Sequence, residues 1–234
     1  LFEGKVLEIG VGRGNDLKNI INKFDIVEYN GVDLGQNLQQ LSEMYTNNKI
    51  VSLIRSDCLY LPFFKNTFDT VYSYGVFHHT ISPQKAIDES LRVLKKNGIL
   101  LFYVYSDHEY NFIKNKLIFI EKFVLNIFYV LPNIICKFLI FLFIMPFTYI
   151  FIIMPTLILR LIKKDKLADY FPLSFTTSAS EIYHNLQDRL MAPINKRFSR
   201  KELFGILNKY NLQQVKIKTL DSGERSGHYV FIKK

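Results

Sequence analysis

The stretch Lys5–Gly14, KVLEIGVGRG, decides the fold of this 234-residue chain. Its first half is a short apolar run that predicts a buried strand, and its second half places glycine at positions 10, 12 and 14. Glycine lets the backbone turn tightly and approach a ligand closely. Because ligands of open parallel sheets bind at the carboxyl ends of the strands, we expect a binding site directly after this strand.

Strand and helix patterns alternate along the first 110 residues or so. Further strands are predicted at Tyr29–Leu34, Ile50–Asp57, Phe68–Tyr74 and Ile99–Tyr105. Helices are predicted from the glycines to about Lys23, near 36–48 and over Pro83–Lys96. Asn97-Gly98 is predicted to end the last of these helices with a left-handed turn. Alternating units of this size predict an α/β fold, a doubly wound, Rossmann-like parallel sheet with helices on both faces.

The end of the chain resumes this pattern. Ser199 and Glu202 form a capping box that starts a helix, and two strands follow at Gln214–Leu220 and His228–Lys233. Roughly 90 residues separate this helix from the fifth strand, which is too long for a loop without structure of its own. We therefore expect three parts: a core over 1–107, a helical apolar cap or insertion over 108–198, and a closing helix with two strands over 199–234.

Acidic residues follow the second and third predicted strands. Asp33 is placed for the two hydroxyls of a ribose, and Asp57, followed by Cys58, for the amino edge of an adenine. A dinucleotide-binding turn needs glycine at its sixth place, where this chain has Asn15, so a pyrophosphate cofactor is disfavoured. Asp57 as a helix N-cap remains an open alternative.

Five segments of this sequence resemble one known family. VLEIGVGRG, GVDLG, SDCLYLPF, FDTVYSYGVFHHT and ESLRVLKKNGILLFYVY are similar to the successive motifs of class I S-adenosylmethionine-dependent methyltransferases, most of all those of the ubiquinone/menaquinone type. The resemblance covers residues 1–106 closely. It implies a seven-stranded sheet with an antiparallel last strand, S-adenosyl-L-methionine as cofactor with S-adenosyl-L-homocysteine as product, and no metal.

The resemblance also implies roles for individual residues. Those assigned to the cofactor are Glu8, Gly10, Gly12 and Gly14 at its methionine end, Asp33 and Leu34 at the ribose, Asp57 and Cys58 at the adenine, and Tyr74 in the cleft. Methyl transfer is a displacement at a sulfonium carbon, so a base is needed only if the nucleophile must lose a proton. His78 and His79 follow the fourth strand and are the candidate catalytic residues, with a structural or substrate-lining role as the alternative.

The net charge of +9 is unevenly distributed. Residues 1–111 carry a net charge of −2, residues 112–164 carry +6 and residues 165–234 carry +5. The cations around 112–164 flank Leu, Ile and Phe runs, which is typical of a membrane-surface segment and not of a nucleic-acid interface. The fourth strand is followed by Tyr-Gly-Val-Phe and not by Asn/Asp-Pro-Pro-Tyr, which argues further against a nucleic-acid base as acceptor.

The insertion contains Phe138–Leu159, 22 residues without a formal charge, enough to span a bilayer. Both ends of the insertion continue into one sheet, so only zero or two crossings are possible. Pro146 and Pro155 are expected to break the run into short pieces. We therefore expect broken helices over 112–162 that lie in the interface or dip into one leaflet; a soluble lid over an apolar substrate and a spanning hairpin are the alternatives.

These observations predict a cytoplasmic, peripheral-membrane methyltransferase that acts on an apolar or lipid-linked small molecule. A soluble small-molecule methyltransferase with an apolar lid, and a non-catalytic membrane-associated module that retains the fold, are the alternatives. Two cysteines in so long a chain exclude a disulfide scaffold and suit a reducing compartment, and Cys58 and Cys136 lack the CxxC spacing of a zinc knuckle or a thiol redox pair. The first strand begins so close to Leu1 that we expect further residues upstream.

Overall fold

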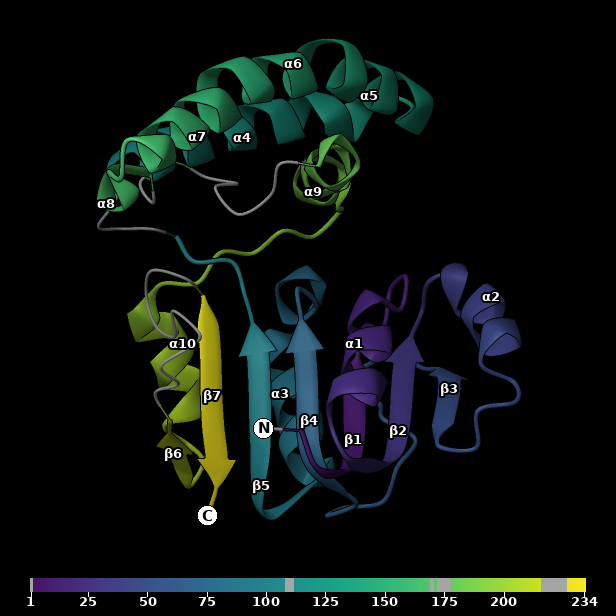
Figure 1. Cartoon of the computed structure of the whole chain (residues 1–234). Helices are drawn as coiled ribbons and strands as arrows, with labels where there is room; N and C mark the ends of the chain where they lie inside the picture. Colours follow the sequence, from purple (N-terminus) through teal and green to yellow (C-terminus); the bar gives the residue numbers. More distant parts are fainter. Residues whose placement is uncertain (1, 108–111, 169–170, 172–177, 216–226) are drawn as a thin grey trace. The chain divides into compact units, whose positions relative to one another are not determined.

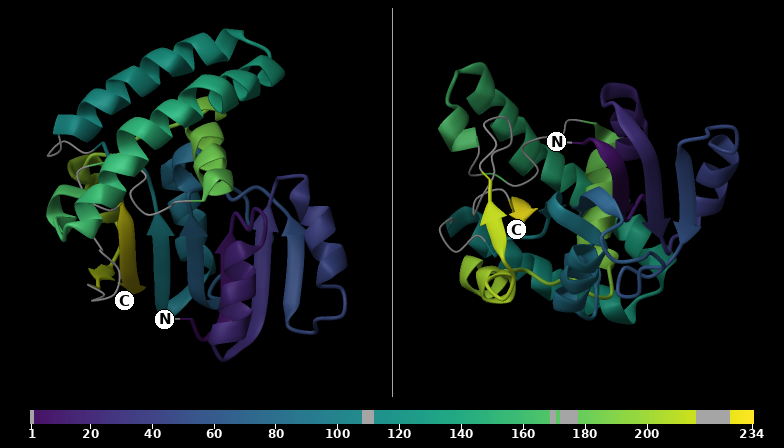
Figure 2. Two further views of the ribbon diagram at one scale, coloured as in Figure 1. Left: turned by 45° about the horizontal axis from the view of Figure 1, so that its top comes forward. Right: turned by 90° about the horizontal axis from the view of Figure 1, so that it is seen from below.

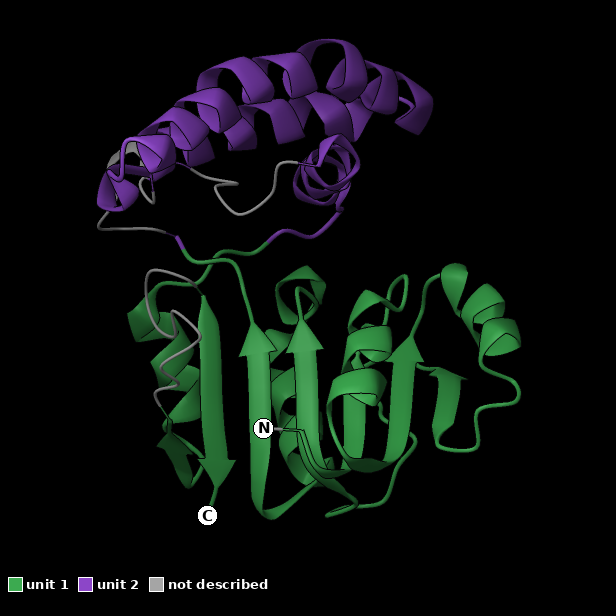
Figure 3. Ribbon diagram, in the orientation of Figure 1, with its two compact units in different colours: residues 1–106, 196–234 green, residues 107–195 purple. Residues whose placement is uncertain are grey.

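The computed structural model describes residues 2–107, 112–168, 171, 178–215 and 227–234. It divides the chain into two compact units, coloured separately in Figure 3. Leu1–Ser106 and Lys196–Lys234 form the first, which we call the sheet unit, and Asp107–Asn195 form the second, which we call the helical unit.

The sheet unit contains one seven-stranded sheet (Figure 1). Its order is β3 (Val51–Arg55), β2 (Ile26–Asp33), β1 (Gly4–Ile9), β4 (Phe68–Tyr74), β5 (Leu94–Tyr103), β7 (His228–Lys233) and β6 (Leu212–Gln214). The first five strands of this order are parallel, and β7 runs antiparallel to both of its neighbours. The predicted Rossmann-like sheet with an antiparallel last strand is confirmed.

Alternate side chains of each strand point to opposite sides of the sheet. Each side therefore has its own hydrophobic core, and helices cover both faces. On β1, Leu7 and Ile9 belong to the core beneath α3 (Pro83–Val93) and α10 (Arg200–Leu207). Val6 belongs to the opposite core, which includes residues of α1 (Asn15–Lys23) and α2 (Asn37–Met44). This alternation leaves Glu8 pointing into the α1 side.

Predicted boundaries differ from the structure at several elements; the predicted strand Gln214–Leu220, for example, overlaps β6 only at Gln214. The helix expected over Pro83–Lys96 ends at Val93, and β5 already begins at Leu94. The β4–β5 register shifts where residues 95–98 bulge, and Asn97 has a φ of +61° there. Asn97 alone is therefore left-handed, and the predicted stop at Asn97-Gly98 lies inside β5 and does not end a helix. Residues 216–220 of the strand predicted at Gln214–Leu220 lie outside the described residues.

The helical unit is dominated by two long helices. α4 (Phe112–Val130) is joined by Leu131 and Pro132 to a continuous helix, Asn133–Leu161. The two run side by side in Figure 1 and in the left view of Figure 2, and we call them the hairpin. α8 (Asp165–Ala168) and α9 (Ala179–Met191) follow. Within the described residues, Asn133–Leu161 is the one helix long and apolar enough to cross a membrane, by length and composition alone.

The expectation that Pro146 and Pro155 break the apolar run is wrong. The helix passes through both prolines as α5 (Asn133–Leu139), a π turn (Ile140–Ile144), α6 (Met145–Thr148), a second π turn (Tyr149–Ile153) and α7 (Met154–Leu161). A proline clashes with the carbonyl four residues before it. Those carbonyls belong to Leu142 and Phe151, and both lie inside the wider π turns, where the hydrogen-bond register has shifted.

The same π turns align the buried face of this helix. Its buried polar and apolar residues recur at every fourth position: Cys136, Ile140, Thr148, Ile152 and Thr156. In a regular helix of 3.6 residues per turn, such a stripe drifts by about 40° at each step and would wind around the helix. The wider turns absorb this drift, and Cys136, Ile140 and Ile152 of the stripe share one buried cluster with Ile182, Leu186 and Leu190 of α9.

Arg92 of α3 holds the loop that follows β3. Its guanidinium donates to the carboxylate of Glu89 at 2.7 and 2.8 Å and to the carbonyls of Phe63 and Leu61 at 2.7 and 2.9 Å. We predict that Arg92→Met lowers the free energy of unfolding by about 1.5–3 kcal/mol, because charge-assisted hydrogen bonds are lost. Urea denaturation measures the free energy of unfolding, and Lys96→Met, at an exposed position, is the control. If both variants lower the free energy of unfolding by the same small amount, the prediction is contradicted.

Candidate functional site

The carboxyl ends of the central strands lie level at one edge of the sheet. Ile9 of β1 is paired with Val32 of β2 and with Ser73 of β4, and Asp33 is paired with Arg55 of β3. The turns that follow these strands therefore start in one row. This register brings together the glycine turn, Asp33, the Asp57 loop and Tyr74, as a parallel sheet requires.

The glycine turn has a left-handed backbone at three alternate positions, with φ of +83° at Gly10, +57° at Gly12 and +77° at Gly14. A Cβ atom at Gly10 would collide with Val76, and one at Gly14 would lie 2.5 Å from Leu41. No heavy atom lies within 4 Å of the place a Gly12 Cβ would occupy. Gly10 and Gly14 are thus needed for packing, whereas Gly12 presents bare backbone to open space, where a ligand can approach.

Asp33 connects the two turns on either side of it. Its Oδ2 accepts the N–H of Gly12 at 2.7 Å, and its Oδ1 accepts the N–H of Gly35 at 2.6 Å. These bonds fix the orientation of the carboxylate at the end of β2. Each oxygen of an ionised carboxylate has a second lone pair, so Asp33 can still accept hydrogen bonds from two hydroxyl groups of a ligand.

Beneath the glycine turn lies a group of acidic and phenolic side chains. Glu8 is almost fully buried and accepts a hydrogen bond from the hydroxyl of Tyr29, and Tyr72 donates to Asp16 at 2.8 Å. Burial is the main cause that raises the pKa of Glu8 to about 8, and the nearby charges of Asp16 and Asp33 raise it further, whereas the Tyr29 hydrogen bond opposes them. Glu8 is therefore mostly protonated at neutral pH.

The loop after β3 contains the predicted adenine-binding residues. Asp57 Oδ1 accepts the N–H of Leu59 at 2.9 Å, so Asp57 closes a turn and is not the N-cap of a helix. Cys58 lies in the hydrophobic core, and burial raises the pKa of its thiol to about 12. The thiol is thus not ionised at neutral pH. Leu34, in contrast, is exposed beside Asp33.

An aromatic row at the same edge was not found from the sequence. The strand register places Tyr74 of β4 beside Tyr103 of β5, and Tyr103 beside His228 of β7. The rings of Tyr74 and Tyr103 stack with centroids 4.7 Å apart, and His228 lies 4.7 Å from Tyr103. Tyr74 is 48% exposed. The sequence contained a signal for this row, because each of the three residues lies at the end of its strand that reaches this edge.

The two candidate catalytic histidines occupy a short 3₁₀ turn, Phe77–His79, after β4. His78 is buried and its ring stacks on Tyr105 at 3.9 Å, while its carbonyl accepts the N–H of Lys196. His79 is only half-buried. This geometry gives His78 a packing role and leaves His79 as the better-placed proton acceptor of the two.

Comparison with known proteins identifies the sheet unit. Residues 7–102 match the family model described as the methyltransferase domain. Curated relatives include cycloartenol-C-24-methyltransferase 1 of Oryza sativa subsp. japonica (30% identity over 112 residues; 44% of this chain and 32% of the relative) and sterol 24-C-methyltransferase ERG6B of Gibberella zeae (29% over 103 residues; 42% and 27%). The chain thus spans about a third of the length of these relatives or less.

Solved structures that match almost the whole chain include one of an activator–methyltransferase complex. It is a chain from the complex between the Haloferax volcanii Trm112 methyltransferase activator and a methyltransferase, with a TM-score of 0.54, 16% identity, and coverage of 97% of this chain and 80% of that one. At this identity the likeness concerns the fold alone. The comparisons support the broad methyltransferase family, and the ubiquinone/menaquinone-type branch is not singled out.

The buried carboxyl group of Glu8 makes stability depend on pH. Because its pKa is higher in the folded than in the unfolded protein, the folded state holds a proton that the unfolded state loses above about pH 4.5, so stability falls as pH rises toward 8. We predict that Glu8→Gln removes this loss and gains at least about 1 kcal/mol relative to wild type between pH 5 and pH 8. Urea denaturation at both pH values measures it. Glu3→Gln, at an exposed position, is the control, and identical pH profiles for wild type and Glu8→Gln would contradict the prediction.

Proposed function

Residues 7–102 are a class I S-adenosylmethionine-dependent methyltransferase domain, and from this we propose that the protein transfers a methyl group to an apolar or lipid-linked small molecule at a membrane surface. The observation that carries the cofactor half of the proposal is the Asp33 carboxylate, oriented by the N–H groups of Gly12 and Gly35 beside an open backbone turn. The apolar helical unit on the same chain supports the other part of the proposal, an apolar or lipid-linked acceptor at a membrane surface.

The residues of the edge fit this cofactor in shape and charge. Asp33 would accept the two ribose hydroxyls, and the turn through Gly12 would face the methionine end, which carries a sulfonium and an ammonium cation. Asp16 lies in the first turn of α1, directly after Gly14, and would supply negative potential there. The first turn of α1 follows Gly14, and its N–H groups suit the methionine carboxylate.

The cofactor supplies an electrophilic methyl group, so the protein has mainly to position the acceptor in line with it. Tyr74 and Tyr103 form an aromatic wall at this edge. Burial raises the pKa of Tyr74 to about 12, so its hydroxyl stays protonated and can donate a hydrogen bond but does not act as a base. His79 would take up a proton if the attacking atom of the acceptor carries one.

Three features support an apolar acceptor and a membrane surface. The hairpin exposes many large apolar side chains, its charge-free run is flanked by cations, and sterol methyltransferases are among the relatives. Cys58 and Cys136 are both unpaired and buried, which suits the cytoplasmic face of the membrane that we assign to the protein.

Loss of the Asp33 carboxylate tests the cofactor site. We predict that wild type binds S-adenosylhomocysteine, and that Asp33→Ala weakens binding by about 1.5–3 kcal/mol, because hydrogen bonds to a charged group are lost. Calorimetric titration in mild detergent measures both affinities. Asp25→Ala, an exposed aspartate that precedes the same strand, is the matched control and should bind like wild type. A folded wild type that binds no S-adenosylhomocysteine would refute the enzyme proposal.

A further inference from the structure

The hairpin has two unlike faces. Its inner face packs on α9, and the buried side chains there form one cluster: Phe128, Cys136, Ile140, Ile152, Ile153, Ile182, Leu186 and Leu190. Glu121 of α4 also turns toward α9, where it lies 3.9 Å from the guanidinium of Arg189. α9 thus covers the inner face and fixes which side of the hairpin is hidden.

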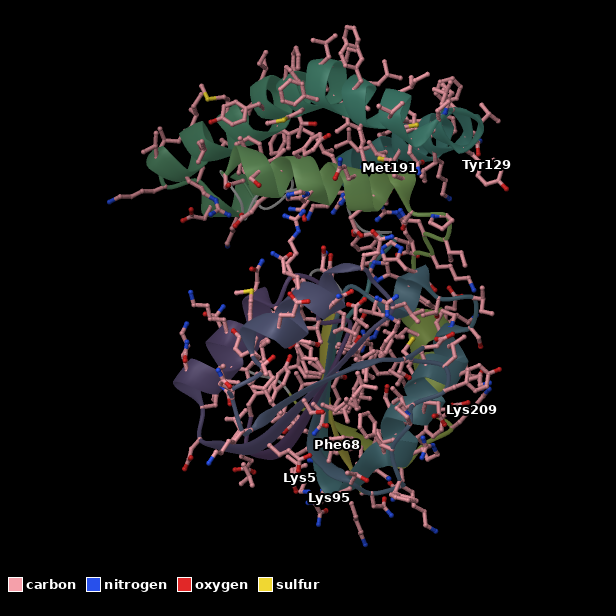
Figure 4. The ribbon with its side chains drawn as sticks, turned by 90° about the vertical axis from the view of Figure 1, so that its right-hand side faces the viewer. Lys5, Phe68, Lys95, Tyr129, Met191 and Lys209 are labelled. Carbon is pink, nitrogen blue, oxygen red and sulfur yellow. The ribbon has the colours of Figure 1, made fainter. Side chains whose placement is uncertain are left out.

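The opposite side, which we call the outer face, is apolar and exposed along its whole length (Figure 4). Its exposed large apolar residues are Phe119, Ile120, Phe123, Ile127, Tyr129 and Val130 of α4, and Ile134, Ile135, Phe138, Phe141, Leu142, Phe143, Phe147, Tyr149, Ile150, Phe151, Met154, Ile158 and Leu161 of the long helix. A soluble monomer rarely exposes so continuous an apolar surface, so this face is a binding surface.

The placement of charge favours a lipid bilayer as the occupant of the outer face. Phe138–Leu159 carries no formal charge, while Lys137 precedes it and Arg160, Lys163 and Lys164 follow it, all four exposed. A protein partner would require polar groups interspersed with the apolar ones to set its register. In the long helix, cations at the two ends of a charge-free apolar run instead match anionic headgroups around an acyl-chain region.

Contacts within the helical unit argue against a bilayer crossing by the hairpin. α9 packs against α4 and against the first half of the long helix. It carries a polar run of side chains: Ser180, Glu181, His184, Asn185, Gln187, Asp188 and Arg189. A spanning hairpin would have to take these groups into the hydrocarbon or detach α9 and lose the shared core. Lys122, exposed in the middle of α4, would also lie at the centre of the bilayer, where a charge is costly.

The length of the long helix also argues against a bilayer crossing by the hairpin. Its 29 residues extend about 43 Å at 1.5 Å per residue, whereas a hydrocarbon core is about 30 Å thick. We propose that the hairpin lies in the plane of one leaflet of an anionic bilayer, with the outer face among the acyl chains, α9 on the water side, and the cations at the two ends among the headgroups. This inference deepens the proposed function and rests on its membrane-surface part.

Depth measurements along the long helix test this orientation, since the chain contains no tryptophan of its own. Phe138→Trp, Phe147→Trp and Ile158→Trp each place one fluorophore at an exposed position near the start, middle or end of the helix. Phe64→Trp, at a 90% exposed position of the sheet unit, is the control. The probe is vesicles of phosphatidylcholine and phosphatidylserine that contain lipids brominated at defined depths.

In-plane docking predicts a blue shift of the emission at all three hairpin positions and quenching at one common, shallow depth, with no blue shift for Phe64→Trp. Deep quenching at position 147 with shallow quenching at 138 and 158 would show a crossing and overturn the proposal. No spectral change on vesicle addition, or a blue shift that depends on protein concentration without lipid, would overturn it in favour of a soluble lid or of self-association.

Charge removal tests the headgroup contacts separately. Lys137→Gln combined with Lys164→Gln should weaken partition onto phosphatidylserine-containing vesicles by roughly tenfold to thirtyfold, since each cation near the surface contributes about 1 kcal/mol. Lys18→Gln combined with Lys65→Gln removes the same charge from exposed positions of the sheet unit and should have a smaller effect. Equal effects of the two pairs would contradict the assigned orientation.

S-adenosylhomocysteine titration of the same variants separates the two proposals. If wild type and the three hairpin tryptophan variants bind this ligand but do not dock on vesicles, the in-plane inference is overturned and the methyltransferase proposal stays intact. Vesicle docking by a protein that binds no S-adenosylhomocysteine would support the in-plane inference and refute the enzyme proposal.

Discussion

The candidate site depends on the carboxylate of Asp33, which accepts one N–H group from the turn after β1 and one from the turn after β2. These two bonds hold both turns at the same level of the sheet edge. The left-handed glycines make that geometry possible, because the turn must pass close to Val76 and Leu41 without a Cβ atom. Glu8, buried below the turn, and the partly buried Asp16 at the start of α1 lie next to this turn.

A second constraint shapes the helical unit. Its chain leaves the sheet unit after Ser106 and returns at Lys196, and the long apolar helix runs beside a second long helix within the helical unit. α4 provides that partner, and α9 covers one side of the pair. The other side has no cover within the described part of the chain, and this asymmetry makes the unit suitable for a surface with an apolar interior.

Local patterns were sufficient to predict the strands, the glycine turn and Asp33, because each depends on residues close in sequence. Features that depend on long-range strand pairing could not be predicted from local patterns. The row of Tyr74, Tyr103 and His228 follows from the strand register. Leu94 belongs to β5 because it pairs with Phe68. The continuous helix was missed because proline was treated as a helix breaker, whereas wider turns accommodate Pro146 and Pro155. The burial of Cys58, which we expect at the cofactor, also depends on long-range packing, because its side chain is part of the core.

Methyl transfer from labelled S-adenosylmethionine in the presence of vesicles made from a total membrane-lipid extract tests the central claim most directly. The account predicts that label enters the organic-soluble fraction, that this requires Asp33, and that it falls when exposed phenylalanines of the outer face are replaced by serine. Label found only in water-soluble products, at a rate independent of vesicles and of the outer face, would contradict it.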